Sequence, residues 1–394
     1  MPKGKRKLPR VSAKEYWCTK CRVVHVRAEM EGSVLRHKYR LHYVRFAGKK
    51  PNPKSRANHM MLTLPEVNFD GPVKTLDSSK RANVVGEFET FIKQRVVGQD
   101  HAVEKFCDLS AKISLGMNDP YRPRGVYLLL GPTGVGKTRI AEAMAEFYLG
   151  DRTRLVKVNC GELSAMFSVK KFGAHLLTAS ESDELNAEVQ EGKDKLAVLL
   201  FDEIEKANRI LYKVLLGVLD RALLRVGDED VDLSHCVIIM TSNLGADKIM
   251  ALLEKAKNQI SEKLEREMRG EAMAAAKGRF SPEFFNRLDE VVVFRPLLRE
   301  TLEKILALEI SIIEHRLISQ NVRLKVMPQA VNFLLDEGTD VRYGARHLKR
   351  VLEHRIVTPV AHLLASGELE RNSRVKIAYS GGRLVFRAVL KGTE

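Results

Sequence analysis

The segment that most restricts how this chain can fold is Gly131–Thr138, or GPTGVGKT, which directly follows the apolar run Val126–Leu130. The residues after it have a helical pattern up to about Phe147. Between a strand and a helix, the spacing G-x-x-x-x-G-K-[ST] predicts a phosphate loop, whose backbone N–H groups surround a phosphate at the positive end of the helix. The predicted nucleotide contacts are Gly131, Pro132, Thr133, Gly134, Val135, Gly136, Lys137 and Thr138. In such a loop the lysine neutralises the β- and γ-phosphates, and the threonine hydroxyl binds Mg²⁺.

The phosphate loop lies within a stretch, residues 87–296, that alternates short apolar runs with helical patterns. The runs are Val126–Leu130, Leu155–Val158, Leu196–Phe201 and Val237–Met240. Their length and the turns that flank them are typical of buried parallel strands. We therefore expect an α/β domain with helices on both faces of a parallel sheet.

Two more features complete the expected C-terminal part. Residues 247–278 are rich in Glu, Lys, Ala and Met and predict a long exposed helix or a pair of helices. Residues 297–394 form a mainly helical small subdomain in this interpretation. It closes with a hairpin, Val375–Tyr379 and Leu384–Val389, around Ser380-Gly381-Gly382.

Two adjacent acids, Asp202 and Glu203, follow the apolar run Leu196–Phe201. Ligands of an open parallel sheet gather at the carboxyl ends of its strands. At this distance from a phosphate loop, we expect Asp202 to hold Mg²⁺ through water. Glu203 is placed to orient and deprotonate the attacking water.

Five segments, in this order and spacing, make the chain from about Val96 onward resemble the Clp/heat-shock AAA+ P-loop ATPases. The likeness is strongest to the second ATPase module of ClpB-type disaggregases, and it covers about three quarters of the chain. The segments are Val96–Asp100, Asp202–Ala207, Met240–Gly245, Pro282–Glu290 and Tyr343–Arg346.

The resemblance implies an ATPase that uses ATP and Mg²⁺, works as a homohexamer and remodels proteins or protein complexes. By the same resemblance, Val97 and Gly98 lie on the adenine side and Asn243 is the first sensor, which helps to position the water. Arg346 is the second sensor, on the small subdomain, and Arg287 is an arginine finger that reaches the ATP of the neighbouring subunit. Both guanidinium groups suit a reaction that needs charge stabilisation more than covalent chemistry.

The chain departs from the family in two ways. Family members that thread polypeptides carry an aromatic Gly-Tyr-Val-Gly pore loop, whereas the matching stretch here, Gly173–Ser180, has Leu176 and Leu177 and no aromatic residue. Members that feed a peptidase carry an Ile-Gly-Phe or similar tripeptide, which is absent between Asn243 and Arg287. We therefore expect little threading and no peptidase partner.

The basic charge of the chain belongs to a head, residues 1–60, that is joined to the body by a linker, 61–86. The head holds 17 of the 66 lysines and arginines against three acids, and the chain as a whole has a formal net charge of +16. Such a head suits a polyanion such as nucleic acid or an acidic protein face, and a solvated tail is the alternative.

The head also contains a cysteine pair at metal-binding spacing. Cys18 and Cys21, followed by His37 and His42, match two-Cys, two-His zinc sites, with His25 as a rival ligand. We expect a zinc-finger-like segment in which residues 15–26 form a knuckle or hairpin. Residues 33–44 are expected to form a helix that carries both histidines near its end.

The remaining sequence features exclude several classes of protein. No run approaches the roughly 18 apolar residues of a membrane helix, and no apolar stretch follows the basic N-terminus as in a secretory signal. Five cysteines without a disulfide framework favour a reducing, cytoplasmic setting. Three hypotheses follow: a protein remodeller, a nucleic-acid-associated motor or switch recruited through the head, and a non-threading assembly factor.

Overall fold

The computed structural model describes residues 83–162, 196–226, 229–370 and 372–389, together with four short strands of the head. The chain divides into two units. One contains the head strands, and the other contains the helices and strands that follow Ala82. Each unit is described by itself.

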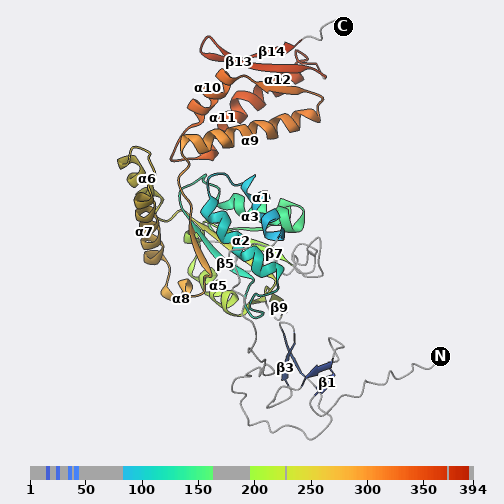
Figure 1. The fold of residues 1–394 in the computed structure, drawn as a ribbon, viewed down its shortest axis with the longest axis vertical. Coiled ribbons are helices and arrows are strands. Elements are labelled where there is room, and N and C mark those ends of the chain that lie inside the picture. The colour runs from blue at the N-terminus through green and yellow to red at the C-terminus, as the bar shows by residue number, and fades with distance from the viewer. Residues whose placement is uncertain are drawn as a thin grey trace, which may run out of the picture. The chain divides into compact units, whose positions relative to one another are not determined.

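The larger unit is built on a five-stranded parallel sheet (Figure 1). Its strands are β5 (Gly125–Leu130), β6 (Val156–Asn159), β7 (Ala197–Asp202), β10 (Cys236–Ser242) and β11 (Glu290–Val293), in the spatial order β11-β5-β10-β7-β6. The register pairs Val126 with Ile238 and Leu199 with Ile238. Every residue of β5 and β10 is buried, as expected for parallel strands covered on both faces.

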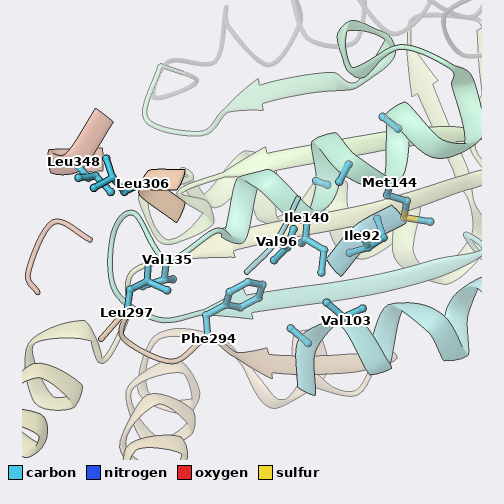
Figure 2. Close-up of a cluster of buried hydrophobic side chains, with 14 of the residues drawn as sticks. Ile92, Val96, Val103, Val135, Ile140, Met144, Phe294, Leu297, Leu306 and Leu348 are labelled. Atoms are coloured by element: carbon cyan, nitrogen blue, oxygen red, sulfur yellow. The ribbon is translucent and has the colours of Figure 1, made fainter. Parts of the chain in front are cut away.

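Alternate side chains of the strands enter two separate hydrophobic cores, because successive residues of a strand point to opposite faces. On one face Leu129, Leu200 and Ile239 pack with α1 (Asn83–Lys93), α2 (Asp100–Ser114) and α3 (Lys137–Leu149). Figure 2 shows part of this core, including Ile140 and Phe294.

On the other face Leu128, Phe201 and Met240 pack with four helices. These are α5 (Arg209–Arg221), α6 (Ala246–Lys255), α7 (Glu262–Arg279) and α8 (Pro282–Phe285). The short hairpin of β8 (Leu223–Val226) and β9 (Glu229–Asp232) follows α5. The prediction of a helix-covered parallel sheet is therefore confirmed.

The C-terminal part is mainly helical and contains a small sheet (Figure 1). Its helices are α9 (Arg299–Ile318), α10 (Pro328–Gly338), α11 (Ala345–Leu352) and α12 (Thr358–Ala365), with a π-helical turn, η3 (Glu353–Val357), between the last two. Leu306 of α9 and Leu348 of α11 belong to the same core as the first face of the large sheet (Figure 2). The expected C-terminal hairpin is present as β13 (Arg374–Ser380) and β14 (Arg383–Val389).

Three elements differ from the expectation or were not anticipated. Strand β11 was not predicted, although Val291–Val293 form a short apolar run directly after the segment assigned to the arginine finger. Strand β12 (Arg323–Val326), which pairs in parallel with β13, was also unexpected. Helix α1 begins at Asn83, inside the stretch assigned to the linker, because Val85 and Phe88 are buried in the first core.

The head strands form two antiparallel pairs. β1 (Glu15–Trp17) pairs with β2 (Val24–Val26), which confirms the expected hairpin. β3 (Val34–His37) pairs with β4 (Arg40–Tyr43), so the helix expected over residues 33–44 is wrong. An isolated helix of this length is marginal in water, whereas the β-branched and aromatic residues favour strands joined by a two-residue connection.

Candidate functional site

The phosphate loop holds a buried ammonium group. Helix α3 begins at Lys137, immediately after Gly136, which has a left-handed φ of 108° that only glycine adopts without strain. The Lys137 side chain turns back into the loop, where its Nζ donates hydrogen bonds to the carbonyl oxygens of Gly131 at 2.6 Å and Pro132 at 2.7 Å. It also donates to Oδ1 of Asn243 at 2.9 Å, and the residue is only 8% exposed.

Burial of this ammonium group lowers the pKa of Lys137 to about 8, although Glu205, Asp202 and Glu203 favour its charged form. Its three hydrogen-bond partners are neutral oxygens, and among the described residues no carboxylate forms a hydrogen bond or ion pair with it. A phosphate oxygen is a stronger acceptor for such a cation. The loop therefore fits the phosphates of a nucleotide.

Strand β7 delivers the two predicted acids at its carboxyl end. Asp202 Oδ1 accepts a hydrogen bond from the hydroxyl of Thr241 at 2.5 Å, and Asp202 Oδ2 lies 2.9 Å from Lys157 Nζ. Burial opposes ionisation of Asp202, but these two hydrogen bonds outweigh it and lower its pKa. Thr138 is the second residue of α3. A carboxylate and a hydroxyl are the hard oxygen donors that Mg²⁺ prefers, so this donor set fits the metal.

Glu203 has an unusual backbone conformation. Its φ of 56° and ψ of 52° lie in the left-handed region, which costs about 1–3 kcal/mol for a residue other than glycine. The backbone N–H of Glu203 donates to Thr241 Oγ1 at 3.1 Å, and its Oε2 lies 2.6 Å from Lys206 Nζ. The strained turn thus holds the carboxylate just beyond the strand end, beside the site.

Asn243 lies among these groups, at the end of β10. Besides accepting from Lys137, its side chain lies 3.5 Å from Glu203 Oε1 and 3.5 Å from Thr133 Oγ1. Its backbone N–H donates to Glu205 Oε1 at 3.1 Å. The structure therefore brings the side chains of Lys137, Glu203 and Asn243 together.

The segment expected on the adenine side packs against the base of the loop. Gly98 has a φ of 76°, and a Cβ there would lie 2.5 Å from the side chain of Thr301 on α9. The next residue, Gln99, is fully buried and donates to the carbonyl oxygens of Val135 at 3.3 Å and Arg295 at 2.9 Å. Its own Oε1 accepts from the backbone N–H of Arg295 at 3.0 Å. Gln99 thus links the phosphate loop to the chain that leads into the C-terminal part.

The predicted second sensor lies at the start of α11, directly against the phosphate loop. The backbone N–H of Ala345 donates to the carbonyl oxygen of Gly134 at 3.1 Å. A Cβ at Gly134 would lie 2.2 Å from the carbonyl oxygen of Tyr343, and a Cβ at Gly344 would lie 2.9 Å from that of Gly134. The positive charge of Arg346 contributes to the lowered pKa of Lys137, after burial. The tip of the loop and the start of α11 are therefore neighbours.

Arg287 follows α8 in the chain, and its side chain contacts acids on α5 and α8. Its Nε and Nη2 donate to the two carboxylate oxygens of Asp220 at 2.5 and 2.6 Å, and its Nη1 lies 2.8 Å from Glu283 Oε1. The salt bridges raise the pKa of Arg287 further and lower that of Asp220. Within the described part of the chain, no hydrogen bond or ion pair joins Arg287 to Lys137 or Asp202.

Some predicted features fall outside the described residues. Cys18 and Cys21 are among them, and only the backbone of the strands that carry His25, His37 and His42 is described. Residues 173–180, the expected pore-loop stretch, are also outside. Across the described residues no group of three or more His, Cys, Asp or Glu side chains is arranged to hold a metal ion. None of the described helices has the length and apolar character to cross a membrane.

Sequence reasoning missed several side chains that shape the site. Thr241 and Glu205 lie inside motifs that it did quote, where only the neighbouring residues were given roles. Gln99 lies inside the adenine-side motif and was likewise given no role. The sequence indicated Lys157 only weakly, since this residue belongs to the predicted strand Leu155–Val158. In the structure that strand, β6, pairs with β7. Asp220 carried none, because its partner is 67 residues away in the chain.

The chain matches two protein families in succession. Residues 122–291 match the family described as "AAA domain (Cdc48 subfamily)". Residues 297–377 match "C-terminal, D2-small domain, of ClpB protein".

Individual proteins with related names are similar to this chain over most of its length. The chaperone protein ClpB of Gloeobacter violaceus is 36% identical over 322 residues, which cover 80% of this chain and 36% of that protein. ClpB of Dichelobacter nodosus is 35% identical over 302 residues, or 76% of this chain and 34% of that protein. A closed-state cryo-EM structure of Hsp104 with ATPγS and FITC casein has a TM-score of 0.63 and 27% identity, covering 78% of this chain and 52% of that one.

This chain spans about a third of the length of the curated relatives it matches. The part that matches contains the phosphate loop, the acids at the end of β7, Asn243, Arg287 and Arg346. From the family matches, the fold and this site, we conclude that the chain carries a ClpB-type AAA+ ATPase module, made of the ATPase domain and its C-terminal small domain.

Proposed function

We propose that this protein uses ATP hydrolysis to remodel proteins or protein complexes, as a ring of six identical subunits. The observation that carries the proposal is the buried ammonium of Lys137, held by neutral oxygens next to Asn243 and Glu203. The ClpB and Hsp104 relatives support the same class of activity at the level of the family.

Each residue of the site has a separate role in ATP hydrolysis. Lys137 exchanges its loop carbonyls for phosphate oxygens, and Thr138 and Asp202 hold the metal. Glu203 accepts a proton from the attacking water, which the side-chain amide of Asn243 orients. Mg²⁺, when bound, neutralises charge on the phosphates. The backbone contact between Gly134 and Ala345 passes changes at the loop to the small domain.

The division of labour is tested with two variants. Lys137→Ala should lose nucleotide binding, whereas Glu203→Gln should keep binding and lose turnover, because only the second residue acts on the water. Binding is measured with a fluorescent nucleotide and turnover by phosphate release. Lys93→Ala and Glu142→Gln are matched controls, since both residues form surface pairs within a helix. Normal turnover in Glu203→Gln would remove Glu203 as the base.

The way in which the ring acts on its substrate is also part of the proposal. Without an aromatic pore loop, the protein acts on a bound partner from outside the pore or on a partner already loosely held. Docking to a peptidase is not part of this function, because the chain between Asn243 and Arg287 is occupied by α6, α7 and α8 and has no matching tripeptide.

A second candidate function is a nucleic-acid-associated AAA+ motor or switch, favoured by the 17 basic residues against three acids in residues 1–60. In this function Cys18, Cys21, His37 and His42 bind one zinc ion. In the chain, the cysteine pair lies between β1 and β2. These two strands pair in antiparallel fashion, as in a hairpin.

Metal analysis and ATPase assays test this alternative. Purified protein should contain about one zinc per chain, and a Cys18→Ser, Cys21→Ser variant should lose it while keeping its basal ATPase. Stimulation of ATPase by nucleic acid that disappears in this variant would favour the second function. Stimulation by unfolded protein would favour the first, and absence of zinc would leave only a basic tail.

A further inference from the structure

Two acids of the same chain contact the guanidinium group of Arg287, the predicted arginine finger, and the two contacts differ in geometry. Asp220, near the end of α5, takes one edge of the Arg287 guanidinium, with Nε–Oδ1 and Nη2–Oδ2 distances of 2.5 and 2.6 Å. Parallel bonds of this kind fix both the position and the plane of the group. The remaining nitrogen, Nη1, contacts Glu283, whose side chain is 62% exposed. The two carboxylates therefore hold the finger with unequal strength.

The two contacts differ in how easily they can be broken. The Glu283 pair joins residues four apart through an exposed side chain, and such pairs contribute little in water. The Asp220 pair is bidentate, and the side chain of Asp220 is 44% exposed, which is less than the 62% of Glu283. A phosphate that approaches the finger can displace Glu283 from Nη1 and leave the edge held by Asp220 intact.

The backbone of the finger is anchored to the same helix. Arg122 donates from Nη2 to the carbonyl oxygen of Arg287 at 2.7 Å, and from Nε to that of Leu219 at 3.4 Å. Arg122 is also paired with Asp289 at 3.5 Å. Both the backbone and one guanidinium edge of Arg287 are thus tied to the last turn of α5.

The aromatic side chains around α8 complete this support. Phe280 and Phe284 are stacked with ring centroids 5.0 Å apart, and Tyr212 of α5 packs against both rings. The short helix that leads to Arg287 is therefore fixed on α5 by packing as well as by charge. A rigid platform of this kind is what a residue acting across a subunit boundary needs, since small misplacements reduce catalysis strongly.

We propose that Asp220 is a positioning residue for ATP hydrolysis, which holds one edge of Arg287 so that Nη1 is presented to the nucleotide of the neighbouring subunit. Glu283 occupies Nη1 until that nucleotide arrives. This inference rests on the proposed ring and on the role of Arg287 within it.

The test compares Asp220→Asn with Glu283→Gln in the full chain. At Asp220 the amide nitrogen of the new side chain would face a guanidinium donor, so the bidentate edge is lost. We expect kcat to fall about 10–100-fold with KM unchanged, which is less than the roughly 10³–10⁵-fold fall for Arg287→Ala. Glu283→Gln should leave kcat unchanged or raise it, and Asp220→Glu should restore part of the rate. Asp336→Asn is the control, since it removes a surface pair that Asp336 forms with Arg299 through a single hydrogen bond.

Mixed rings separate positioning from a general structural defect. A subunit that carries both Lys137→Ala and Asp220→Asn cannot bind nucleotide, but it still offers its finger to a neighbour. Doped into the unmodified protein, it should lower ATPase more than Lys137→Ala alone, because only the neighbour's site is affected.

The outcomes distinguish this inference from the proposed function. If Arg287→Ala is slow but Asp220→Asn is as fast as the unmodified protein, the positioning role is wrong and the ring stands. A faster Asp220→Asn would show that the carboxylate restrains the finger, which also refutes the proposal. If the ATPase rate of Arg287→Ala equals that of the unmodified protein, the proposed ATP site shared between subunits is wrong, and the positioning role falls with it.

Discussion

Replacement of Gly134 by alanine should separate the phosphate loop from the second sensor. Two costs follow from the structure. The φ of 75° at this position costs about 1–2 kcal/mol for an L-residue with a Cβ. The new Cβ would also lie 2.2 Å from the carbonyl oxygen of Tyr343, a backbone atom that no rotamer change can move.

The contact must therefore open, and the hydrogen bond from Ala345 N–H to Gly134 is lost with it. A hydrogen bond of this kind contributes about 0.5–1.5 kcal/mol. The backbone cost at Gly134 and the lost hydrogen bond together destabilise the docked arrangement by roughly 1.5–3.5 kcal/mol, which corresponds to about a 10–400-fold change in the docking equilibrium.

Hydrogen exchange at the Ala345 amide measures this equilibrium directly, because that N–H is protected by Gly134. We expect exchange to accelerate in Gly134→Ala, and also in Gly344→Ala, which meets the same contact from the opposite side. Gly270→Ala is the control, since a Cβ on this helical residue would meet nothing within 4 Å. Unchanged exchange in both loop variants, with both folded, would refute the view that this backbone contact joins the two domains.

Two further predictions concern the ring and its pore. Arg287→Ala should bind ATP but hydrolyse it about 10³–10⁵-fold more slowly, and mixing with subunits that lack the phosphate-loop lysine should restore some activity. ATPase that does not depend on protein concentration would count against a shared site. A stably folded reporter, whose stability is about 5–15 kcal/mol, should resist unfolding by this protein with ATP, because the sequence Gly173–Ser180 contains no aromatic residue that could grip a polypeptide. Robust unfolding that disappears in Leu176→Ala, Leu177→Ala would show that two aliphatic side chains suffice.

The sequence could predict the chemistry of the site because that information is local. The glycines, Lys137 and Thr138 lie within eight residues, so their spacing specifies the loop directly. The acids after β7 were predictable for a related reason, since ligands gather where parallel strands end at one edge of the sheet. Asn243 after β10 was assigned only through the resemblance to the family. The head shows the limit of this reasoning: local pattern favoured a helix over residues 33–44, but β3 and β4 pair as strands.

Local pattern also did not reveal how these groups are held. The left-handed turn at Glu203 depends on Thr241, which is 38 residues away and lies on another strand. The buried amide of Gln99 finds Arg295 across 196 residues of chain. The spacing of residues along the chain predicts neither contact, because each contact forms only when separate strands, helices and loops pack together.

By itself, the sequence determined the phosphate loop and the parallel sheet, since each is written in a short stretch with its own periodicity or spacing, whereas the sensor and finger motifs were identified through the family resemblance. Only the tertiary structure decided that Asp220 clasps Arg287 and that Gly134 touches the start of α11. Those contacts join segments 67 and 211 residues apart. The physical reason is that a contact between distant segments is selected by packing and burial of the whole domain, whereas a loop or strand is selected by its own neighbours.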